Sequence, residues 1–185
     1  MIAKPYAEVF NSNNIASGEN SHAEGYNTTA SGNYSHAEGN GAIVSGYASH
    51  AEGYETTASG NYSHAEGIRA VADGACSHAE GIHTTASSYC QHTQGKYNIV
   101  DANNKYAHIV GNGEVNSLSN AHTLDWNGNA WFAGDVYVGS TSGKNKDEGS
   151  KKLVTEAELA SLIAQITEAV SQKSQVQLIT WEADD

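Results

Sequence analysis

The sequence predicts an all-β chain organised around a parallel β-roll of 14-residue repeats, followed by a small β-hairpin region and a short helix. Six histidines recur every 14 residues from His22 to His92, and five of them lie in the pentapeptide Ser-His-Ala-Glu-Gly. The chain has 19 glycines and a single proline, which suits tight and regular corners. A fixed interval of this length indicates one small unit stacked on copies of itself.

Composition and charge exclude several classes of partner. The net charge is −12 and only nine residues are Lys or Arg, whereas binding to nucleic acid or anionic lipid depends on those two residues. We therefore expect no nucleic-acid partner. No apolar stretch is long enough to span a bilayer, so we also expect no membrane insertion. The opening residues 1–6 lack the apolar run of a secretory signal, which indicates either a protein not secreted by that route or a fragment of a longer chain.

The repeat array is expected to span residues 7–104, after an N-terminal segment of residues 1–6. The first full unit, SHAEGYNTTASGNY, begins at Ser21, four similar units follow, and the degenerate unit QHTQGKYNIVDANN ends the array at Asn104. Each unit holds two half-motifs of the form x-Ala-x-Gly, seven residues apart. This layout predicts two short strands and two corners in every unit.

The interior of the roll is expected to be very thin. Strand side chains alternate between faces, so the alanines of both half-motifs face inward. The interior position of the second strand is always small, and the residue before it is always β-branched. The small residues are Ala16, Ala30, Val44, Ala58, Ala72, Ala86 and Val100, and the β-branched ones are Ile15, Thr29, Ile43, Thr57, Val71, Thr85 and Ile99. Such a roll buries too little apolar surface to offset the entropy of ordering the backbone, about 1–2 kcal/mol per residue, so we expect it to associate with copies of itself.

The pattern Ser-x-Ala-x-Gly-x-x-x-x-Ala-x-Gly resembles the head repeat of the trimeric autotransporter adhesins, the YadA-like head. The resemblance covers about residues 7–104 and implies a left-handed parallel β-roll assembled as a homotrimer. The chain departs from that family by placing His and Glu where the adhesin repeats usually carry Val and Ile. Its repeat sequences, Ser-His-Ala-Glu-Gly and Thr-Thr-Ala-Ser-Gly, are more similar to the version in phage and prophage tail fibres of Gram-positive bacteria.

Residues 105–140 are expected to form a β-hairpin region. Asn127-Gly128 is a strong two-residue turn signal between the strand candidates 121–126 and 130–138. Four aromatic residues in this region are expected to build a small core that the roll lacks: Trp126, Trp131, Phe132 and Tyr137. Residues 120–129 also resemble segments of phage tail and appendage proteins.

A polar linker is expected at residues 141–154 and a helix at residues 155–173. Thr155 and Glu158 form a capping box at the start of the helix. The apolar positions follow a heptad pattern, with Leu159, Leu162, Ile166 and Ala169 at a and d and with Ile163 and Val170 beside them. Two heptads are marginal for a lone helix, so we expect a coiled coil, with docking on the hairpin of the same chain as the alternative. Residues 174–185 form a tail, in which residues 175–181 could be an extended strand.

Two rows of polar residues run along the predicted stack, and we call them the His–Glu ladder. His22 and Glu24 lie two apart on one strand, so their side chains share a face, and every later rung repeats the pair. The ladder consists of His22, Glu24, His36, Glu38, His50, Glu52, His64, Glu66, His78, Glu80, His92 and Gln94. If this face meets a trimer axis, the buried carboxylates need hydrogen bonds from histidine. We therefore predict a polar network between chains, without metal or cofactor. A zinc or nickel ion held by His and Glu is one alternative, and an outward, solvated ladder is another.

Catalysis is not expected from the repeated Ser, His and Glu. Ser21 and His22 are adjacent and point to opposite faces of a strand, and a catalytic constellation seldom recurs five times at one interval. Cys76 and Cys90 are also 14 residues apart and should lie on neighbouring rungs. We expect two small buried or edge thiols there rather than a disulfide, because stacked parallel side chains suit a disulfide poorly.

Together these features predict a non-enzymatic, homotrimeric tail-fibre segment on the tail of a phage or prophage particle. It would recognise bacterial surface glycan or protein through multivalent contacts and bind other tail proteins. The candidate ligand contacts are Tyr26, Tyr34, Tyr54, Tyr62, Trp126 and Trp131. One alternative is a trimeric adhesin head on a bacterial cell surface. Another is a tailspike-like enzyme that degrades polysaccharide, for which Asp125 and Asp135 would be the candidate carboxylates.

Overall fold

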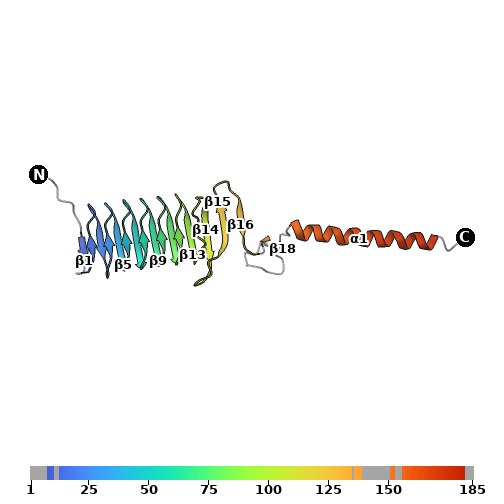
Figure 1. The fold of residues 1–185 in the computed structure, drawn as a ribbon, viewed down its shortest axis with the longest axis horizontal. Coiled ribbons are helices and arrows are strands. Elements are labelled where there is room, and N and C mark those ends of the chain that lie inside the picture. The colour runs from blue at the N-terminus through green and yellow to red at the C-terminus, as the bar shows by residue number, and fades with distance from the viewer. Residues whose placement is uncertain (1–7, 11–12, 135, 139–150, 153–155, 182–185) are drawn as a thin grey trace. The chain divides into compact units, whose positions relative to one another are not determined.

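The computed structural model describes residues 8–10, 13–134, 136–138, 151–152 and 156–181 (Figure 1). The chain divides into two compact units, residues 1–134 and 135–185, and each is described by itself. Among the described helical residues, none forms a helix that is both long enough and apolar enough to cross a membrane.

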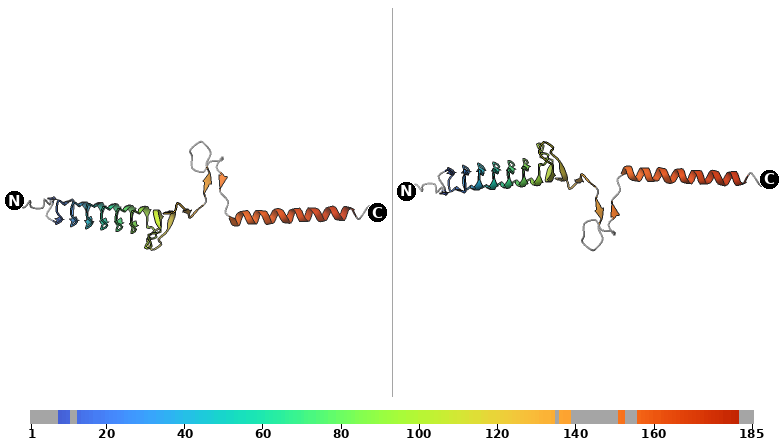
Figure 2. Two further views of the ribbon diagram at one scale, coloured as in Figure 1. Left: turned by 90° about the horizontal axis from the view of Figure 1, so that it is seen from above. Right: turned by 90° about the horizontal axis from the view of Figure 1, so that it is seen from below.

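The first unit is a parallel β-solenoid in which each coil contributes one strand to each of two sheets (Figure 2). The first sheet begins with the longer strands β1 Glu8–Phe10, β3 His22–Glu24, β5 His36–Asn40, β7 His50–Tyr54, β9 His64–Ile68, β11 His78–Ile82 and β13 His92–Lys96. The second sheet consists of β2 Ile15–Ala16, β4 Thr29–Ala30, β6 Ile43–Val44, β8 Thr57–Ala58, β10 Val71–Ala72 and β12 Thr85–Ala86. His22 pairs with His36 and Thr29 with Ile43, so equivalent positions of successive units lie beside each other. This confirms the predicted roll with two strands and two corners per unit.

The corners of the solenoid follow an interval of seven residues. Residues in the left-handed region of backbone conformation recur at every seventh position from Asn20 (φ 53°) to Asn104 (φ 52°). Some of these positions are held by residues that rarely adopt that region, such as Tyr62 (φ 59°) and Arg69 (φ 53°). The stacked coils therefore impose the corner geometry even where the local sequence does not favour it.

The core of the solenoid consists of small side chains. Its buried hydrophobic residues are Ala23, Ala30, Ala37, Ala42, Val44, Ala51, Ala58, Ala65, Ala70, Ala72, Ala79 and Ala86. The predicted thin interior is thus confirmed, with two corrections. Ala16 is only partly buried because β2 is the end strand of its sheet. Val100 is 43% exposed because the chain leaves the repeat after β13 and forms no second-sheet strand there.

Polar side chains close the last coil. Asn98 pairs with the Thr85 backbone, accepting a hydrogen bond from its N–H at 2.7 Å and donating one to its carbonyl oxygen at 3.1 Å. The buried Asp101 carboxylate accepts hydrogen bonds at 2.8 Å from the backbone N–H groups of Lys105 and Tyr106 and one at 3.1 Å from Gln91 Nε2. These contacts satisfy backbone groups that another 14-residue coil would otherwise pair.

Three further strands extend the first sheet. The strand β14 Tyr106–Asn112 pairs parallel with β13, and β15 Asn120–Asp125 and β16 Ala130–Phe132 follow in antiparallel order. The predicted hairpin is present between β15 and β16, but the returning strand ends at Phe132. The predicted aromatic core is wrong, because Trp126, Trp131 and Phe132 are 48%, 58% and 49% exposed. β16 is the edge strand of the sheet, and all three of its residues are exposed. The side chain of Tyr137 lies outside the described residues.

The second unit contains a short strand pair and a helix. β17 Tyr137–Val138 pairs antiparallel with β18 Lys151–Lys152, so the end of the predicted linker is a strand, and residues 139–150 lie outside the described residues. The helix α1 Glu156–Trp181 continues well past the expected end at residue 173, and residues 175–181 are helical rather than extended. No glycine or proline interrupts this span, so nothing in it ends the helix early. Five apolar side chains of its expected stripe are exposed in the single chain: Leu159, Leu162, Ile163, Ile166 and Val170. Thr155, the expected N-cap, lies outside the described residues.

The candidate functional site, a histidine–glutamate ladder

The ladder lies on the outer face of the first sheet, opposite the alanine core. Ser21 and Ala23 are buried, whereas His22 and Glu24 between and beside them are partly exposed. The Ser21 hydroxyl donates a hydrogen bond to the Gly18 carbonyl oxygen at 2.8 Å, and Ser35, Ser49 and Ser63 do the same at their own corners. The serine hydroxyl therefore stabilises the turn, whereas the histidine side chain lies on the outer face. The two groups are separated, as the alternation of side chains along the strand predicted.

The histidine side chains form a column of stacked rings. From His36 to His92, neighbouring ring centroids lie 4.7–4.9 Å apart, with interplanar angles of 1–10°. His22 is the exception, since its ring meets that of His36 edge-on at 77°. Stacking follows from the fold, because parallel strands in register repeat at about the distance at which aromatic rings stack.

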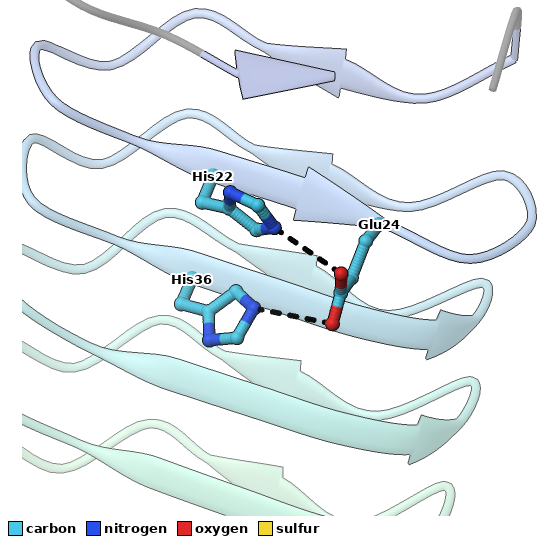
Figure 3. Close-up of side chains that lie close together, drawn as sticks. All are labelled: His22, Glu24 and His36. Atoms are coloured by element: carbon cyan, nitrogen blue, oxygen red, sulfur yellow. Dashed lines mark hydrogen bonds and ion pairs between the residues drawn. The ribbon is translucent and has the colours of Figure 1, made fainter. Parts of the chain in front are cut away.

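Each described carboxylate of the ladder lies within reach of a histidine on its own rung, on the next rung or on both (Figure 3 shows the first such group). Glu24 Oε2 lies 3.3 Å from His22 Nε2, and Glu24 Oε1 lies 3.9 Å from His36 Nε2. Later rungs keep mainly the contact to the next rung, which is 3.4 Å between Glu66 and His78. The structure therefore brings His and Glu together along the whole column.

The pKa values show that the carboxylates share protons. Hydrogen bonds with the carboxylates of Glu52 and Glu24, together with partial burial and their negative charge, raise the pKa of Glu38 to about 7. A hydrogen bond with Glu38 lowers the pKa of Glu24, with a further contribution from His22, and a separate hydrogen bond with Glu38 lowers the pKa of Glu52. Glu38 therefore holds a proton up to near neutral pH and donates it to its neighbours.

Burial also keeps histidines of the ladder neutral. Desolvation lowers the pKa of His36 and of His50, and repulsion from the neighbouring histidines adds to it. Both shifts outweigh the attraction of the nearby glutamates, which acts in the opposite direction. Around Glu38 the ladder is thus better described as neutral imidazoles of His36 and His50 beside a protonated carboxyl group than as ion pairs.

Five imidazole nitrogens of the ladder are shielded from solvent and make no hydrogen bond in the single chain. They are the Nε2 atoms of His36, His50, His64, His78 and His92. The carboxylate oxygens lie 3.4–3.9 Å away, close enough for electrostatic attraction but outside good hydrogen-bond geometry. A buried polar atom without a partner costs about 1–3 kcal/mol, so the ladder favours a further partner.

The ladder extends beyond the residues that the repeat interval predicted. His108 on β14 pairs in register with His92, with ring centroids 5.2 Å apart, and its Nε2 lies 3.2 Å from Gln94 Nε2. The rings of His122 and Phe132 continue the column. The ring centroids of His108 and His122 lie 5.5 Å apart, and those of His122 and Phe132 lie 4.6 Å apart. Burial lowers the pKa of His108. The 14-residue interval missed His108 because the connecting loop is two residues longer, although the shared spacing His-x-x-Gly at residues 92–95 and 108–111 marks the pair. His122 was missed because its strand is antiparallel.

The candidate tyrosine contacts are exposed and fall into different places. Tyr34 and Tyr62 flank Tyr47, and the three rings meet edge to face with centroids 5.4 Å and 5.5 Å apart. Tyr47 was not predicted because it stands one position earlier in its unit. Tyr26 and Tyr54 are 52% and 44% exposed and lie at the other end of the ladder strands.

The two candidate tryptophans lie at different places on the surface. Trp131 lines a groove of about 910 Å³ at the closed end of the solenoid, together with Tyr106, Asn129 and Lys105. Trp126 is exposed but does not line that groove. The predicted aromatic contacts therefore supply several separate surfaces rather than one pocket.

Of the two candidate carboxylates of a tailspike-like enzyme, Asp125 lies among the described residues. Asp125 accepts hydrogen bonds from the backbone N–H groups of Asn127 and Asn129 and from Asn129 Nδ2, and these bonds lower the pKa of Asp125. Its carboxylate therefore holds the β15–β16 turn. Asp135 lies outside the described residues.

Cys76 and Cys90 are exposed, free thiols at left-handed corners of neighbouring coils. Partial desolvation and the neighbouring Cys90 thiol raise the pKa of Cys76, which makes that thiol less reactive. This arrangement confirms the placement on neighbouring rungs and the expectation of free thiols.

Comparison with known families identifies the repeats. Four overlapping segments match the YadA head domain repeat (2 copies), at residues 13–35, 23–49, 37–63 and 51–75. Together they cover residues 13–75, which is about a third of the chain. No curated protein matches the sequence. Residues 13–75 are therefore similar to YadA head repeats, a structural and adhesive family whose β-roll is trimeric.

Proposed function

We propose that the chain is the homotrimeric, adhesive part of a fibre and that the ladders of three copies meet along a common axis. The observation that carries the proposal is the column of shielded histidine nitrogens without hydrogen-bond partners on one face of the solenoid. A second and a third copy would supply carboxylates and imidazoles to this face at every rung. Regular rungs would then repeat the same contacts along the axis.

The energetics of a single copy support self-association. The hydrophobic residues of the described solenoid core are alanines and one valine, and each of these small side chains buries little apolar surface. Larger apolar side chains lie exposed on the ladder strands instead, among them Ile68 and Ile82, which are 44% and 41% exposed. Burying such a side chain fully is worth about 1.5–3 kcal/mol, so packing between copies adds stabilisation that the interior cannot provide.

The mass in solution tests the trimer. One chain has a mass of 19.5 kDa, so a trimer has 3 × 19.5 = 58.5 kDa by light scattering. Glu52→Arg, which would place three arginines on one rung of the axis, should yield monomers. The matched control Ser45→Arg places the same side chain at an exposed position beside the second sheet and should leave the trimer intact. A wild-type monomer, or a trimer that tolerates both variants equally, would overturn the axial assignment.

Within this class we propose a receptor-binding segment of a phage or prophage tail fibre, which binds glycan or protein on a bacterial surface and contacts other tail proteins. The repeat wording and the acidic charge support this placement, since neither nucleic acid nor an anionic membrane suits a chain of net charge −12. Three copies would display three columns built from Tyr34, Tyr47 and Tyr62, so weak individual contacts would add up to firm attachment.

Attachment to whole cells tests this role. Labelled wild-type protein should bind Gram-positive cells. If the receptor is a glycan, purified cell-wall glycan should compete with this binding, and if the receptor is a protein, protease treatment of the cells should abolish it. The monomeric variant Glu52→Arg should bind far more weakly, because avidity falls steeply when two of three contacts are lost. Tyr62→Ser, at a 60% exposed position, should weaken binding without changing the mass in solution. Equal binding by the trimer and the monomer would contradict multivalent recognition.

The YadA head match favours a second location, namely the bacterial cell surface. Antibodies against the chain distinguish the two locations by electron microscopy. Labelling confined to the tails of induced particles supports the fibre, and labelling of intact, uninduced cells supports a surface adhesin.

A further inference from the structure

We propose that the His–Glu ladder binds divalent transition-metal ions of the zinc class, two per chain. Four groups of ladder side chains each place three ligand atoms within 4.8 Å of one another. The groups are His22, Glu24 and His36; His36, Glu38 and His50; Glu52, His64 and Glu66; and Glu66, His78 and Glu80. Each group combines imidazole nitrogen with carboxylate oxygen, which are the usual ligands of zinc and nickel.

The spacing of the ligand atoms suits tetrahedral coordination. Bonds of about 2.0–2.1 Å from zinc to nitrogen and oxygen place neighbouring ligand atoms about 3.3 Å apart. Glu24 Oε2 lies 3.3 Å from His22 Nε2, and Glu66 Oε1 lies 3.4 Å from His78 Nε2. Small rotations of the glutamate side chains are therefore enough to place three ligands around one ion.

The state of the histidines also favours coordination. The Nε2 atoms of His36, His64 and His78 are shielded from water and make no hydrogen bond. A metal ion satisfies such a nitrogen through its lone pair, and the adjacent carboxylates balance the charge of the ion. The glutamate side chains remain 31–43% exposed, and a shallow groove of about 300 Å³ runs past Glu66, Glu80 and Gln94. An ion can therefore approach the ladder of a single chain from solvent, before copies meet along the proposed axis.

Shared ligands set the stoichiometry. The first two groups both use His36, and the last two both use Glu66, so with one ligand atom from each residue only one ion of each pair has a full set of ligands. One ion therefore binds in residues 22–50 and one in residues 52–80. Imidazole ligands select against magnesium and calcium, which prefer oxygen ligands alone. All ligands come from one chain, so the inference does not depend on the trimer.

Calorimetric titration of the metal-stripped full chain with zinc chloride tests the proposal. We expect two zinc ions per chain, a higher thermal unfolding midpoint with excess zinc, and no binding of magnesium chloride under the same conditions. Cobalt(II) should give the visible absorption bands of a tetrahedral site. Absence of zinc binding, or equal binding of zinc and magnesium, would overturn the proposal.

Two variants locate the ions. The double variant His64→Gln and His78→Gln removes the histidines of the second pair of groups, so it should bind one zinc ion instead of two. The control His83→Asn removes a histidine that stacks on Tyr97 away from the ladder, at a corner where Asn27 holds the equivalent place, and it should still bind two. If the double variant does not fold in EDTA, Glu66→Gln replaces it, because Gln94 holds the equivalent position of a later rung. Two ions in the ladder variant, or loss of an ion in the control, would refute the assignment.

Discussion

Replacing Gly60 by alanine tests how closely the coils of the solenoid are stacked. A Cβ atom at Gly60 would lie 2.1 Å from the carbonyl oxygen of Gly74 and 2.5 Å from its carbonyl carbon. Carbon and oxygen approach to about 3.3 Å without overlap, so the two coils would have to separate locally by about 1 Å. Both contacts are with backbone atoms, which cannot move aside as a side chain can.

The cost follows from the hydrogen bonds that join these coils. The N–H groups of Ser59 and Gly60 both donate to the Ala72 carbonyl oxygen at 3.1 Å, and the Cys76 N–H donates to the Asn61 carbonyl oxygen at 2.8 Å. Separation by about 1 Å breaks these bonds, each worth about 1 kcal/mol. We therefore expect the free energy of unfolding to fall by about 3 kcal/mol, roughly a 150-fold change in the folding equilibrium.

Urea unfolding followed by circular dichroism, at one fixed protein concentration, measures this change. Gly134→Ala is the matched control, because a Cβ there has nothing within 4 Å, and its free energy of unfolding should stay within about 0.5 kcal/mol of wild type. If Gly60→Ala is as stable as that control, the coils are not stacked at this distance and the reasoning fails.

Three further changes test other parts of the fold. Ala48→Gly should raise the free energy of unfolding by about 1 kcal/mol, because alanine holds a left-handed corner there (φ 48°); a lower urea midpoint would contradict this reading. Glu38 has a pKa raised to about 7 in the folded chain, above its ordinary value of 4.5, so its contribution is present at acidic pH and is lost as the pH rises through 7. Measured in EDTA, the free energy of unfolding of Glu38→Gln should therefore rise by about 1 kcal/mol relative to that of wild type between pH 6 and pH 8, a value reduced for solvent screening. A difference that stays constant across this range would rule out the raised pKa. Asp101→Ala should cost about 2–4 kcal/mol in urea unfolding, because it leaves the N–H groups of Lys105 and Tyr106 unpaired, and unchanged hydrogen exchange at those two amides would show that the carboxylate does not hold them.

The repeat pattern was enough to predict the solenoid and its interior. A 14-residue interval with alanine at two fixed places leaves only one way to stack identical strands, and alternation then assigns Ala23 to the inside and His22 to the outside. The same interval explains a departure from the pattern. Glycine at the position of Gly60 is required by the backbone of the next coil, and Ser88 replaces it only in the last full unit, where its hydroxyl donates to the Asp101 carbonyl oxygen at 2.9 Å.

Features without a repeat were harder to predict. The sequence pattern placed a hairpin near Asn127-Gly128 correctly, but whether Trp131 is buried depends on what packs against β16, and nothing in the local pattern shows that it is an edge strand. The helix was expected to end at residue 173, although residues 174–181 contain no helix-breaking residue. Apolar spacing shows where a helix packs, and the absence of glycine and proline shows how far it can run.

For the candidate site, the sequence by itself determined which residues lie in the His–Glu ladder and on which face, because side-chain direction in a strand alternates and the repeats fall in register. The tertiary structure alone decided the distances between rings and carboxylates, the shared proton at Glu38 and the addition of His108 and His122. These properties depend on the separation of the strands and on the path of the loops between them. Contacts among all the stacked coils set both, so no single repeat determines them.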